Sequence, residues 1–351
     1  MHYLITGHTG FKGAWLILLL TEAGHTVSGL SLDPEPGCLF ERASLAERMT
    51  CDFRSDIRDA NATAAAIRKA SPDVVIHMAA QPLVRESYRE PRLTIETNVN
   101  GTFNVLEAVG ATESVKAHLA VTTDKVYRNV NRVEGYREDE PLGGDDPYSV
   151  SKAMADLLVH SWTHSFAGPP TALARAGNVI GGGDASKERL LPDIMRSFAS
   201  GKAAEIRYPN AVRPWQHVLD CLHGYLLLVD SLLESSGSVS DHGAWNFGPE
   251  PASFATVADV AARTATLWGP TAAITLNTDP QPHEAGLLTL DSTKAREILG
   301  WRDLLSLDDA LAWTVDWEKS VASGRSAIDI SIDQIAVFVG MERPRNSRLT
   351  P

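Results

Sequence analysis

Tyr148 and Lys152 stand four residues apart in the stretch Tyr148-Ser149-Val150-Ser151-Lys152. In a helix this spacing places both side chains on one face. An ammonium beside a phenol favours the phenolate and lowers a phenol pKa that starts near about 10. Tyr148 is therefore a candidate base for removing a proton from a hydroxyl group. Taken alone, such a pair is usually an interface tyrosine beside a solvated lysine, and further motifs are needed to favour catalysis.

A second group of reactive side chains, Thr123-Asp124-Lys125, lies upstream of Tyr148 and ends the apolar stretch from His118. We expect a strand over residues 118–123, with a hydroxyl, an acid and a base at its end. Neighbouring residues on a strand point to opposite faces, so Asp124 and Lys125 can reach one substrate only if the chain turns there. The alternative is a surface Asp-Lys pair at the start of a loop.

A glycine-rich turn near the N-terminus indicates the cofactor. Thr6-Gly7-His8-Thr9-Gly10-Phe11-Lys12-Gly13 joins an apolar run to a helical apolar stretch, which is the context that a dinucleotide fingerprint requires. Gly7 permits a tight turn, Gly10 lets backbone amides approach a pyrophosphate, and Gly13 lets the helix pack closely on the strand. The pyrophosphate would face the positive end of the helix.

The choice between NAD and NADP depends on the end of the second strand, which we expect over residues 26–32. Asp33 follows it directly. An acidic side chain there can bond a ribose 2′-hydroxyl and repel a 2′-phosphate, so NAD is favoured. Alternatively, Asp33 only opens the Asp33-Pro34 turn.

The elements that must position these groups alternate along the first half of the chain. Residues 74–80 form an apolar run typical of a parallel strand buried on both faces, and a helix is expected over residues 92–110. This alternation predicts an α/β fold with a doubly wound, Rossmann-like parallel sheet and a site at the carboxyl ends of its strands.

The length of 351 residues exceeds the usual range of a single core. We expect an NAD-binding domain over residues 1–175, to which later segments return, and a smaller α/β substrate-binding lobe over residues 176–320. Residues 321–351 are expected to be a peripheral C-terminal tail, mobile from residue 343 onward.

Composition excludes several classes of function. The net charge of −12 and the absence of a basic cluster make nucleic acid and membrane surfaces poor partners. The apolar run over residues 15–20 is too short to span a bilayer. Cys38, Cys51 and Cys221 lack C-x-x-C spacing, which argues against disulfides and a structural metal site and fits a cytoplasmic protein.

With these residues in place, the chain resembles the extended short-chain dehydrogenase/reductase family, and within it the nucleotide-sugar 4,6-dehydratases that act on CDP-glucose. The resemblance runs from Tyr3 to about Trp317. Besides the glycine loop and the Asp124-Lys125 pair, the stretches that carry it are His77 to Arg85, Thr97 to Thr102, Arg175 to Asp184, Arg213 to Val218 and Pro282-His283-Glu284-Ala285.

The resemblance implies an NAD-dependent lyase that dehydrates a nucleotide-diphospho-hexose and moves a hydride from C4 to C6 of the sugar. Tyr148 would take the O4 proton while Thr123 holds O4. Asp124 would protonate the departing O6, and Lys125 would remove the C5 proton. Related dTDP-glucose dehydratases carry Asp-Glu at this pair, whereas 4-epimerases lack it.

Binding residues are expected for both ligands. Those for NAD are Gly7, Thr9, Gly10, Phe11, Gly13, Asp33, Asp56, Ile57, Ala79, Ala80, Asn98, Tyr148 and Lys152. Those for the nucleotide sugar are Gln81, Asn178, Arg189, Leu190, Arg213 and His217. Arg213 could instead pair with a carboxylate, and His217 could be packed in the core. His283 and Glu284 lack the partners of a metal site, and no role is assigned to them.

Two other readings stay open. The nearest is a dehydratase for another nucleotide sugar or a 4-epimerase, and the second is a non-catalytic NAD-binding sensor, for which a damaged catalytic set would be the sign. By resemblance, the apolar faces of helices over residues 92–110 and 148–164 pair with a second subunit, giving a homodimer or a dimer of dimers.

Overall fold

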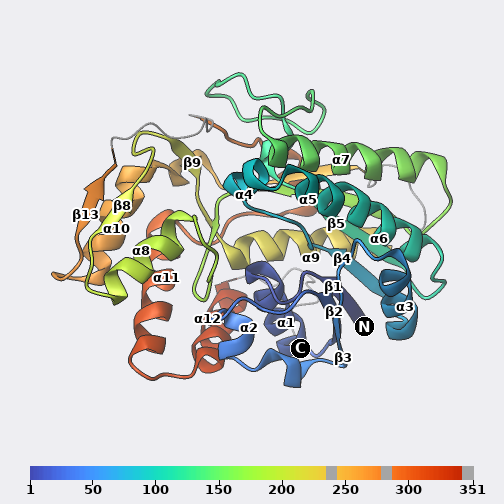
Figure 1. The fold of residues 1–351 in the computed structure, drawn as a ribbon, viewed down its shortest axis with the longest axis horizontal. Helices are drawn as coiled ribbons and strands as arrows, with labels where there is room; N and C mark the ends of the chain where they lie inside the picture. The colour runs from blue at the N-terminus through green and yellow to red at the C-terminus, as the bar shows by residue number, and fades with distance from the viewer. Residues whose placement is uncertain (235–242, 278–286, 342–351) are drawn as a thin grey trace.

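The computed structural model of the chain describes residues 1–234, 243–277 and 287–341, and at its centre lies a seven-stranded sheet (Figure 1). The strand order is β11-β6-β5-β4-β1-β2-β3, and every neighbouring pair is parallel. The strands are β1 (His2–Thr6), β2 (Thr26–Ser31), β3 (Cys51–Arg54), β4 (Val74–His77), β5 (Ala117–Val121), β6 (Thr171–Ala176) and β11 (Ala244–Phe247). The predicted doubly wound sheet is confirmed.

Both faces of this sheet are buried because apolar side chains alternate along its strands. In β1, Tyr3 and Ile5 join one core cluster while Leu4 joins the other. The helices on the first face are α1 (Phe11–Glu22), α9 (Val218–Glu234) and α12 (Ala327–Met341). Those on the second face are α3 (Ala60–Ala70), α6 (Gly101–Gly110) and α7 (Pro147–Ser165). The site-bearing strand ends therefore rest on a rigid three-layer base.

Three strands end earlier than the sequence predicts. β2 ends at Ser31, β4 ends at His77, and β5 ends at Val121. After β5, Thr123 is still extended, but Asp124–Val126 forms a 3-10 turn, η3. The chain therefore turns at Asp124, where a turn is needed for Asp124 and Lys125 to reach one substrate.

The helix expected over residues 92–110 begins one residue earlier and is divided. It consists of α5 (Pro91–Ile95), a π-helical turn η2 (Glu96–Asn100) and α6. The short α4 (Val84–Arg89) precedes it. Single π-turns inside helices often occur at functional sites, and this one carries Asn98.

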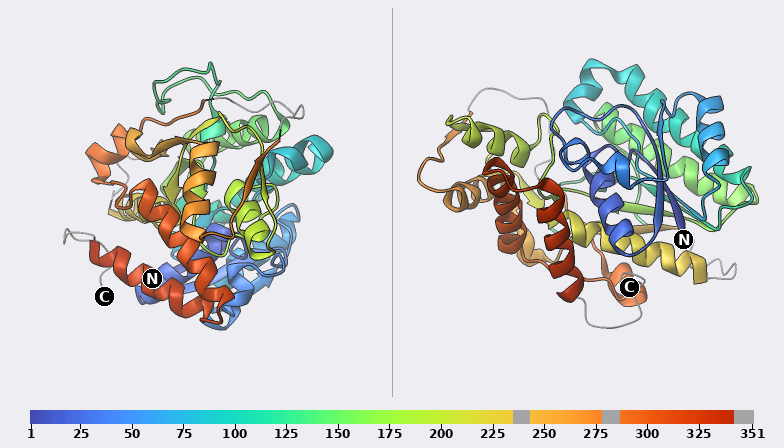
Figure 2. Two further views of the ribbon diagram at one scale, coloured as in Figure 1. Left: turned by 90° about the vertical axis from the view of Figure 1, so that its left-hand side faces the viewer. Right: turned by 90° about the horizontal axis from the view of Figure 1, so that it is seen from below.

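A smaller lobe lies beside the sheet and has its own apolar core (Figures 1 and 2). Its strands pair two by two, as β7 (Val179–Ile180) with β10 (Gln216–His217), β8 (Ala204–Ile206) with β13 (Ile274–Leu276), and β9 (Val212–Pro214) with β12 (Phe254–Thr256). Its helices are α8 (Leu190–Ala199), α10 (Val257–Trp268) and α11 (Leu307–Ala322). The remaining short elements are α2 (Leu39–Arg42), η1 (Leu45–Arg48), η5 (Pro251–Ser253) and η6 (Ala295–Leu299).

The predicted peripheral tail is wrong for residues 327–341. They form α12, which contacts α1, α2 and α11. Ile330, Ile335 and Phe338 are buried in the larger core cluster because the apolar face of α12 covers that side of the domain. The residues from Arg343 onward lie outside the described part of the chain.

Within the described residues, none of the helices combines the length and the apolar character that crossing a membrane requires.

Candidate active site

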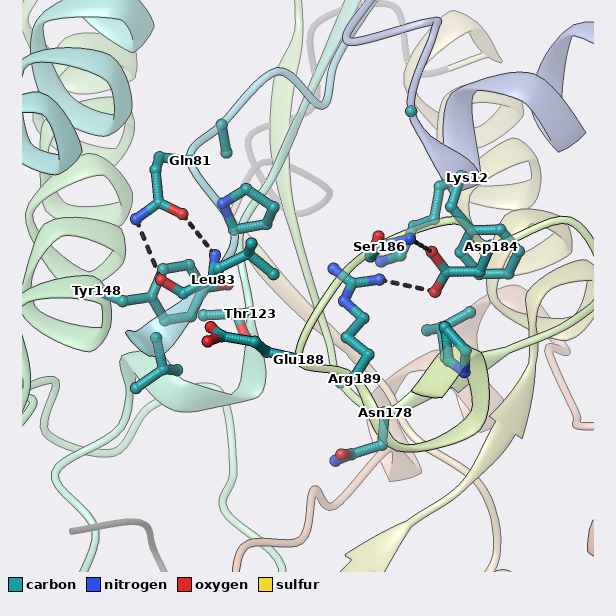
Figure 3. A pocket seen from close by; sticks show the side chains of 18 of the residues that line it. Lys12, Gln81, Leu83, Thr123, Tyr148, Asn178, Asp184, Ser186, Glu188 and Arg189 are labelled. Atoms are coloured by element: carbon teal, nitrogen blue, oxygen red, sulfur yellow. Dashed lines mark hydrogen bonds and ion pairs between the residues drawn. The ribbon is translucent and has the colours of Figure 1, made fainter. Parts of the chain in front are cut away.

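A cavity of about 840 Å³ opens at the carboxyl ends of β1, β4, β5 and β6, where the sheet meets the smaller lobe. The glycine loop forms one end of its wall, and the catalytic candidates form another part of it. Figure 3 shows side chains that face one another across this space, with Thr123 and Tyr148 on one side and Arg189, Asp184 and Lys12 on the other. Two groups of residues predicted separately from the sequence thus share one chamber.

The glycine loop has the tight geometry that its residue types predict. Gly7 has a φ of +75°, and a Cβ placed on it would lie 2.8 Å from the Ala79 Cα atom. A Cβ on Gly13 would lie 2.4 Å from the Gly7 carbonyl oxygen. Gly10 caps α1 without a side-chain hydrogen bond, so the amides at this helix end face the cavity unscreened.

Most of the predicted cofactor residues line this cavity. They are Gly7, Thr9, Gly10, Phe11, Gly13, Asp56, Ile57, Ala79, Ala80, Tyr148 and Lys152. The Asp56 carboxylate accepts hydrogen bonds from the Arg58 side chain, which hold the pKa of Asp56 below its usual value. The structure does not bring Asp33 to the wall. Asp33 is exposed beyond the end of β2, and Leu32 and Glu35 line the cavity there instead.

Asn98 does not line the cavity either, but it supports a residue that does. Its side chain accepts a hydrogen bond from the Gln81 backbone N–H at 2.8 Å and donates to the Gln81 carbonyl and to Ser151 Oγ. The Gln81 side chain bonds Thr94 Oγ1 and both backbone groups of Leu83. Gln81 is therefore fixed by the π-turn and the loop after β4.

The η3 turn brings Thr123, Asp124 and Lys125 to the same cavity. Thr123 Oγ1 donates to Asp124 Oδ1 at 2.8 Å, and Asn178 Nδ2 donates to Asp124 Oδ2 at 3.4 Å. Asp124 is only 2% exposed, which excludes a surface Asp-Lys pair. In a straight strand Asp124 and Lys125 would point to opposite faces, whereas the η3 turn lets both line the cavity.

The Tyr148–Lys152 pair lies on one face of α7 as predicted, but its electrostatics differ from the expectation. Burial raises the pKa of Tyr148 to about 12, partly offset by a hydrogen bond with Thr123. Burial, with a contribution from Lys12, lowers the pKa of Lys152 to about 8. Lys152 Nζ donates to the Val121 carbonyl at 2.9 Å. In the protein without ligands, the phenol is therefore not ionised by its neighbour.

The predicted sugar-nucleotide residues divide into two groups. Gln81, Asn178, Arg189, Leu190 and Arg213 all line the cavity. Arg189 pairs with Asp184 at 3.3 Å, and Arg213 is buried and donates to the Val212 carbonyl. His217 does not line it: the imidazole packs against Trp15 and Trp313, and burial lowers its pKa to about 3.

Lys12 and Glu188 line the cavity but were not among the site residues predicted from the sequence. Lys12, inside the glycine loop, donates to Tyr225 Oη at 3.0 Å and lies close enough to affect Lys152. Glu188 has a φ of +61°, pairs with Arg89 at 2.7 Å, and keeps its second carboxylate oxygen buried without a partner among the described residues. The sequence could have indicated Lys12, because a lysine within a glycine-rich loop is a recognisable phosphate-binding pattern. It could not have indicated Glu188, because no sequence pattern predicts its backbone conformation. His283 and Glu284 lie outside the described residues.

Known proteins share both the sequence and the architecture of this chain. It is 43% identical over 344 residues to the CDP-glucose 4,6-dehydratase of Salmonella typhimurium, covering 95% of each chain. It is 27% identical to dTDP-glucose 4,6-dehydratase 1 of Escherichia coli, covering 90% of this chain and 92% of that one.

Two solved structures have the same fold. The dTDP-glucose 4,6-dehydratase DesIV of Streptomyces venezuelae, with NAD and TYD bound, aligns with a TM-score of 0.76 at 24% identity, over 93% of this chain and 100% of that one. A UDP-glucuronic acid 4-epimerase of Bacillus cereus, in complex with UDP-glucuronic acid and NAD, aligns with a TM-score of 0.78 at 22% identity, over 92% and 100%.

The sequence model described as GDP-mannose 4,6 dehydratase matches residues 4–314, which include the glycine loop and every catalytic candidate. Taken with the 43% identical relative and the cavity just described, this match shows that the chain belongs to the GDP-mannose 4,6-dehydratase family.

Proposed function

We propose that this protein is an NAD-dependent lyase that converts CDP-glucose to CDP-4-keto-6-deoxyglucose. The observation that carries the proposal is that Thr123, Asp124, Lys125, Tyr148 and Lys152 all line one cavity. The relative at 43% identity, which is a CDP-glucose 4,6-dehydratase, supports CDP-glucose as the substrate.

The other end of the same cavity fits a dinucleotide. Gly7 and Gly13 leave no room for a side chain, so the backbone there can approach a pyrophosphate closely, and the amides at the start of α1 face it. When bound, NAD⁺ would supply the hydride chemistry, as the acceptor of a hydride from C4 of the sugar and its donor to C6. Binding of NAD by the similar DesIV enzyme supports this assignment.

The protein groups divide the proton transfers between two steps. In the first, Tyr148 takes the proton of O4 while the Thr123 hydroxyl holds that oxygen, so that C4 becomes a ketone. Because burial keeps the Tyr148 phenol protonated in the protein alone, we infer that the base forms only in the complex with ligands. In the second step the ketone makes the C5 proton acidic. Lys125 removes it, and Asp124 protonates the departing O6, which leaves as water. Lys125 then returns its proton to C5 as C6 takes up the hydride.

The experiment that tests this proposal uses CDP-glucose carrying deuterium at C4. Mass detection should find a product lighter than the substrate by water, with the deuterium on the terminal methyl group. A panel of UDP-, dTDP- and GDP-linked hexoses run in parallel identifies the preferred base. Absence of a 4-keto-6-deoxy product from every hexose in the panel would disprove the dehydratase assignment.

The main rival is a nucleotide-sugar 4-epimerase, whose fold is equally similar. Epimerisation needs the first step only, so it has no use for an acid and a base directed at C5 and C6. The buried Asp124 beside Lys125 therefore favours dehydration. A product equal in mass to the substrate would instead identify an epimerase.

We also propose that the protein is a homodimer, alone or as half of a dimer of dimers. On α7, the side opposite Tyr148 and Lys152 carries Val150, Met154 and Leu157, which are exposed, and Phe103 of α6 is exposed as well. We name these four residues the α7 patch. Exposed apolar stripes of this kind typically pair with another subunit.

Cys38, Cys51 and Cys221 are unpaired thiols, which suits a cytoplasmic location.

A further inference from the structure

A buried ion pair lies behind the catalytic wall, between α7 and the sheet. Arg175 donates from Nε and Nη2 to the two carboxylate oxygens of Asp156 at 2.9 and 2.7 Å, and the two side chains are 4% and 2% exposed. Paired hydrogen bonds of this kind fix orientation as well as charge. Losing one partner of such a pair leaves an uncompensated charge in the interior, so the two residues are held as a unit.

Two chains of hydrogen bonds lead away from this ion pair, and we call them its two arms. The first arm reaches the end of β5. Thr122 Oγ1 donates to Asp156 Oδ2 at 3.0 Å, and Thr122 directly precedes Thr123. On α7, Tyr148, Lys152 and Asp156 follow one another at intervals of four residues and are all buried, so they share the face that packs on the sheet. Asp156 therefore joins the strand end that carries Thr123 to the helix that carries Tyr148.

The other arm reaches the far side of the η3 turn. Arg175 Nη1 donates to Tyr127 Oη at 2.8 Å, and Tyr127 Oη donates to Asn246 Oδ1 at 2.7 Å. Tyr127 directly follows η3, which carries Asp124 and Lys125. The ion pair thus holds the chain both before and after the three reactive residues.

We propose that Asp156 and Arg175 are positioning residues for the two steps, acting on Thr123 through Thr122 and on Asp124 and Lys125 through Tyr127. Of these four side chains only Thr122 lines the cavity, and its hydroxyl is bonded to Asp156. A displacement of about 1 Å at reacting groups costs up to about a hundredfold in rate, so a lost hydroxyl in this network has a measurable effect. The inference rests on the proposed function.

Two substitutions cut one arm each. Thr122→Val removes the hydroxyl that bonds Asp156, and Tyr127→Phe removes the hydroxyl that bonds Arg175. Thr171→Val is the matched control, because Thr171 is buried at the opposite end of β6 and its hydroxyl bonds the Pro169 carbonyl. Single-turnover mixing of the NAD-loaded enzyme with CDP-glucose follows C4 oxidation by NADH absorbance and water loss by quenching and mass detection.

The two arms should affect different steps. Thr122→Val should slow NADH formation about tenfold, and Tyr127→Phe should leave it within about twofold of wild type while slowing water loss about tenfold. Thr122→Ser, which keeps the hydroxyl, should recover most of the NADH rate. Thr171→Val should change neither step. If both variants run both steps at wild-type rates, or slow both steps equally with a lowered melting temperature, the network only supports the fold and the proposal is overturned.

Failure of the proposed function would look different, because wild-type enzyme would not reduce its NAD with CDP-glucose. The same rate ratios would then be measured with whichever nucleotide hexose does reduce it. If none does, a crystal structure of Thr122→Val decides, since a Thr123 hydroxyl and an η3 turn in unchanged positions would contradict a positioning role.

Discussion

Asp124 and Lys125 work from adjacent positions because the chain leaves the sheet just before them. Strand geometry would send their side chains to opposite faces, whereas the η3 turn lets both line the cavity. Asp124 is also buried and bonded by Thr123 and Asn178. These contacts fix the position of its carboxyl group at the cavity wall.

We predict that Asp124→Asn stops the reaction between its two steps. The amide cannot protonate O6, so bound NAD should be reduced by CDP-glucose while formation of the 4-keto-6-deoxy product falls by at least about a hundredfold. Stopped-flow absorbance and mass detection measure the two events. Asp145→Asn, on the exposed loop before α7, is the control and should behave as wild type. Product formed at the normal rate would contradict the acid role.

A second prediction concerns the stability cost of Lys152. Its pKa in the folded protein is about 8, below the ordinary 10.5, because the ammonium is buried. Below pH 8 folding must bury the charge, which costs about 3 kcal/mol, and the cost disappears as pH rises to 10.5 because the lysine then loses its charge in both states.

Lys152→Met should therefore raise the free energy of unfolding of the ligand-free protein by about 2 kcal/mol at pH 7, allowing for the lost bond to Val121. The gain should shrink between pH 8 and 10.5, while activity is lost. Urea unfolding at several pH values measures this, with the exposed Lys187→Met as a control that changes little. If Lys152→Met instead lowered the free energy of unfolding at pH 7, burial of the Lys152 ammonium would not cost stability and the prediction would be wrong.

Residue types and spacing identify most of the site at this scale, since each of the five catalytic candidates lines the cavity. They do not identify Asp156, although its position one turn beyond Lys152 was a usable signal. They do not show that His217 packs in the core, because a packed imidazole does not differ in sequence from a functional one. The role of Asp33 at the ribose stays a prediction, since its side chain is exposed just beyond β2.

At the scale of elements, the site depends on close contact between two loops. The loop after β6 passes Asp124 so tightly that a Cβ on Gly177 would lie 2.1 Å from Asp124 Oδ2. We predict that Gly177→Ala displaces this carboxyl group and lowers product formation at least about tenfold, without abolishing NAD binding. Steady-state kinetics and NAD titration test it.

The control for this change is Gly168→Ala, since a Cβ on Gly168 would meet nothing within 4 Å and its φ is not positive. Wild-type kinetics for both variants would mean that Asp124 moves aside without consequence, and that its exact placement is unimportant for the reaction.

The order of strands and helices could be predicted because apolar runs and glycine turns are local signals. The π-turn was not predicted, and the bonds of its Asn98 to Gln81 join two segments that are apart in the sequence. The ends of β2, β4 and β5 were also misplaced, because apolar or β-branched residues continue past the last strand residue in all three. Residue patterns therefore locate elements better than they locate the points where elements stop.

At the scale of the whole molecule, α7 presents one buried face to the cavity and one exposed apolar face to the outside. One carries Tyr148 and Lys152, and the other carries the α7 patch. We predict that Leu157→Glu converts the proposed homodimer to monomers, because it would place a charge in the middle of the proposed apolar interface. Light scattering coupled to gel filtration measures the mass. Val337→Glu, on the equally exposed surface of α12, should leave the dimer intact. A wild-type protein that is already monomeric would refute the dimer proposal.

The arrangement of two lobes around one cavity follows from the sequence, but the role of the chain end does not. Residues 327–341 are amphipathic only weakly, since apolar residues recur around much of the helix. Only the folded protein shows that Ile330 and Phe338 are buried in the larger core cluster and that α12 contacts α1 and α2.

The docking of α12 has a practical consequence for anyone shortening this protein. A chain stopped after Ala322 would still contain the glycine loop and every catalytic side chain, yet it would uncover the outer surface of the helix that presents its amides to the cofactor. We expect such a fragment to precipitate or to bind NAD weakly, whereas one stopped after Met341 should purify normally. Solubility measurements and NAD titration of the two fragments would show whether α12 is needed to cover the apolar core or is dispensable.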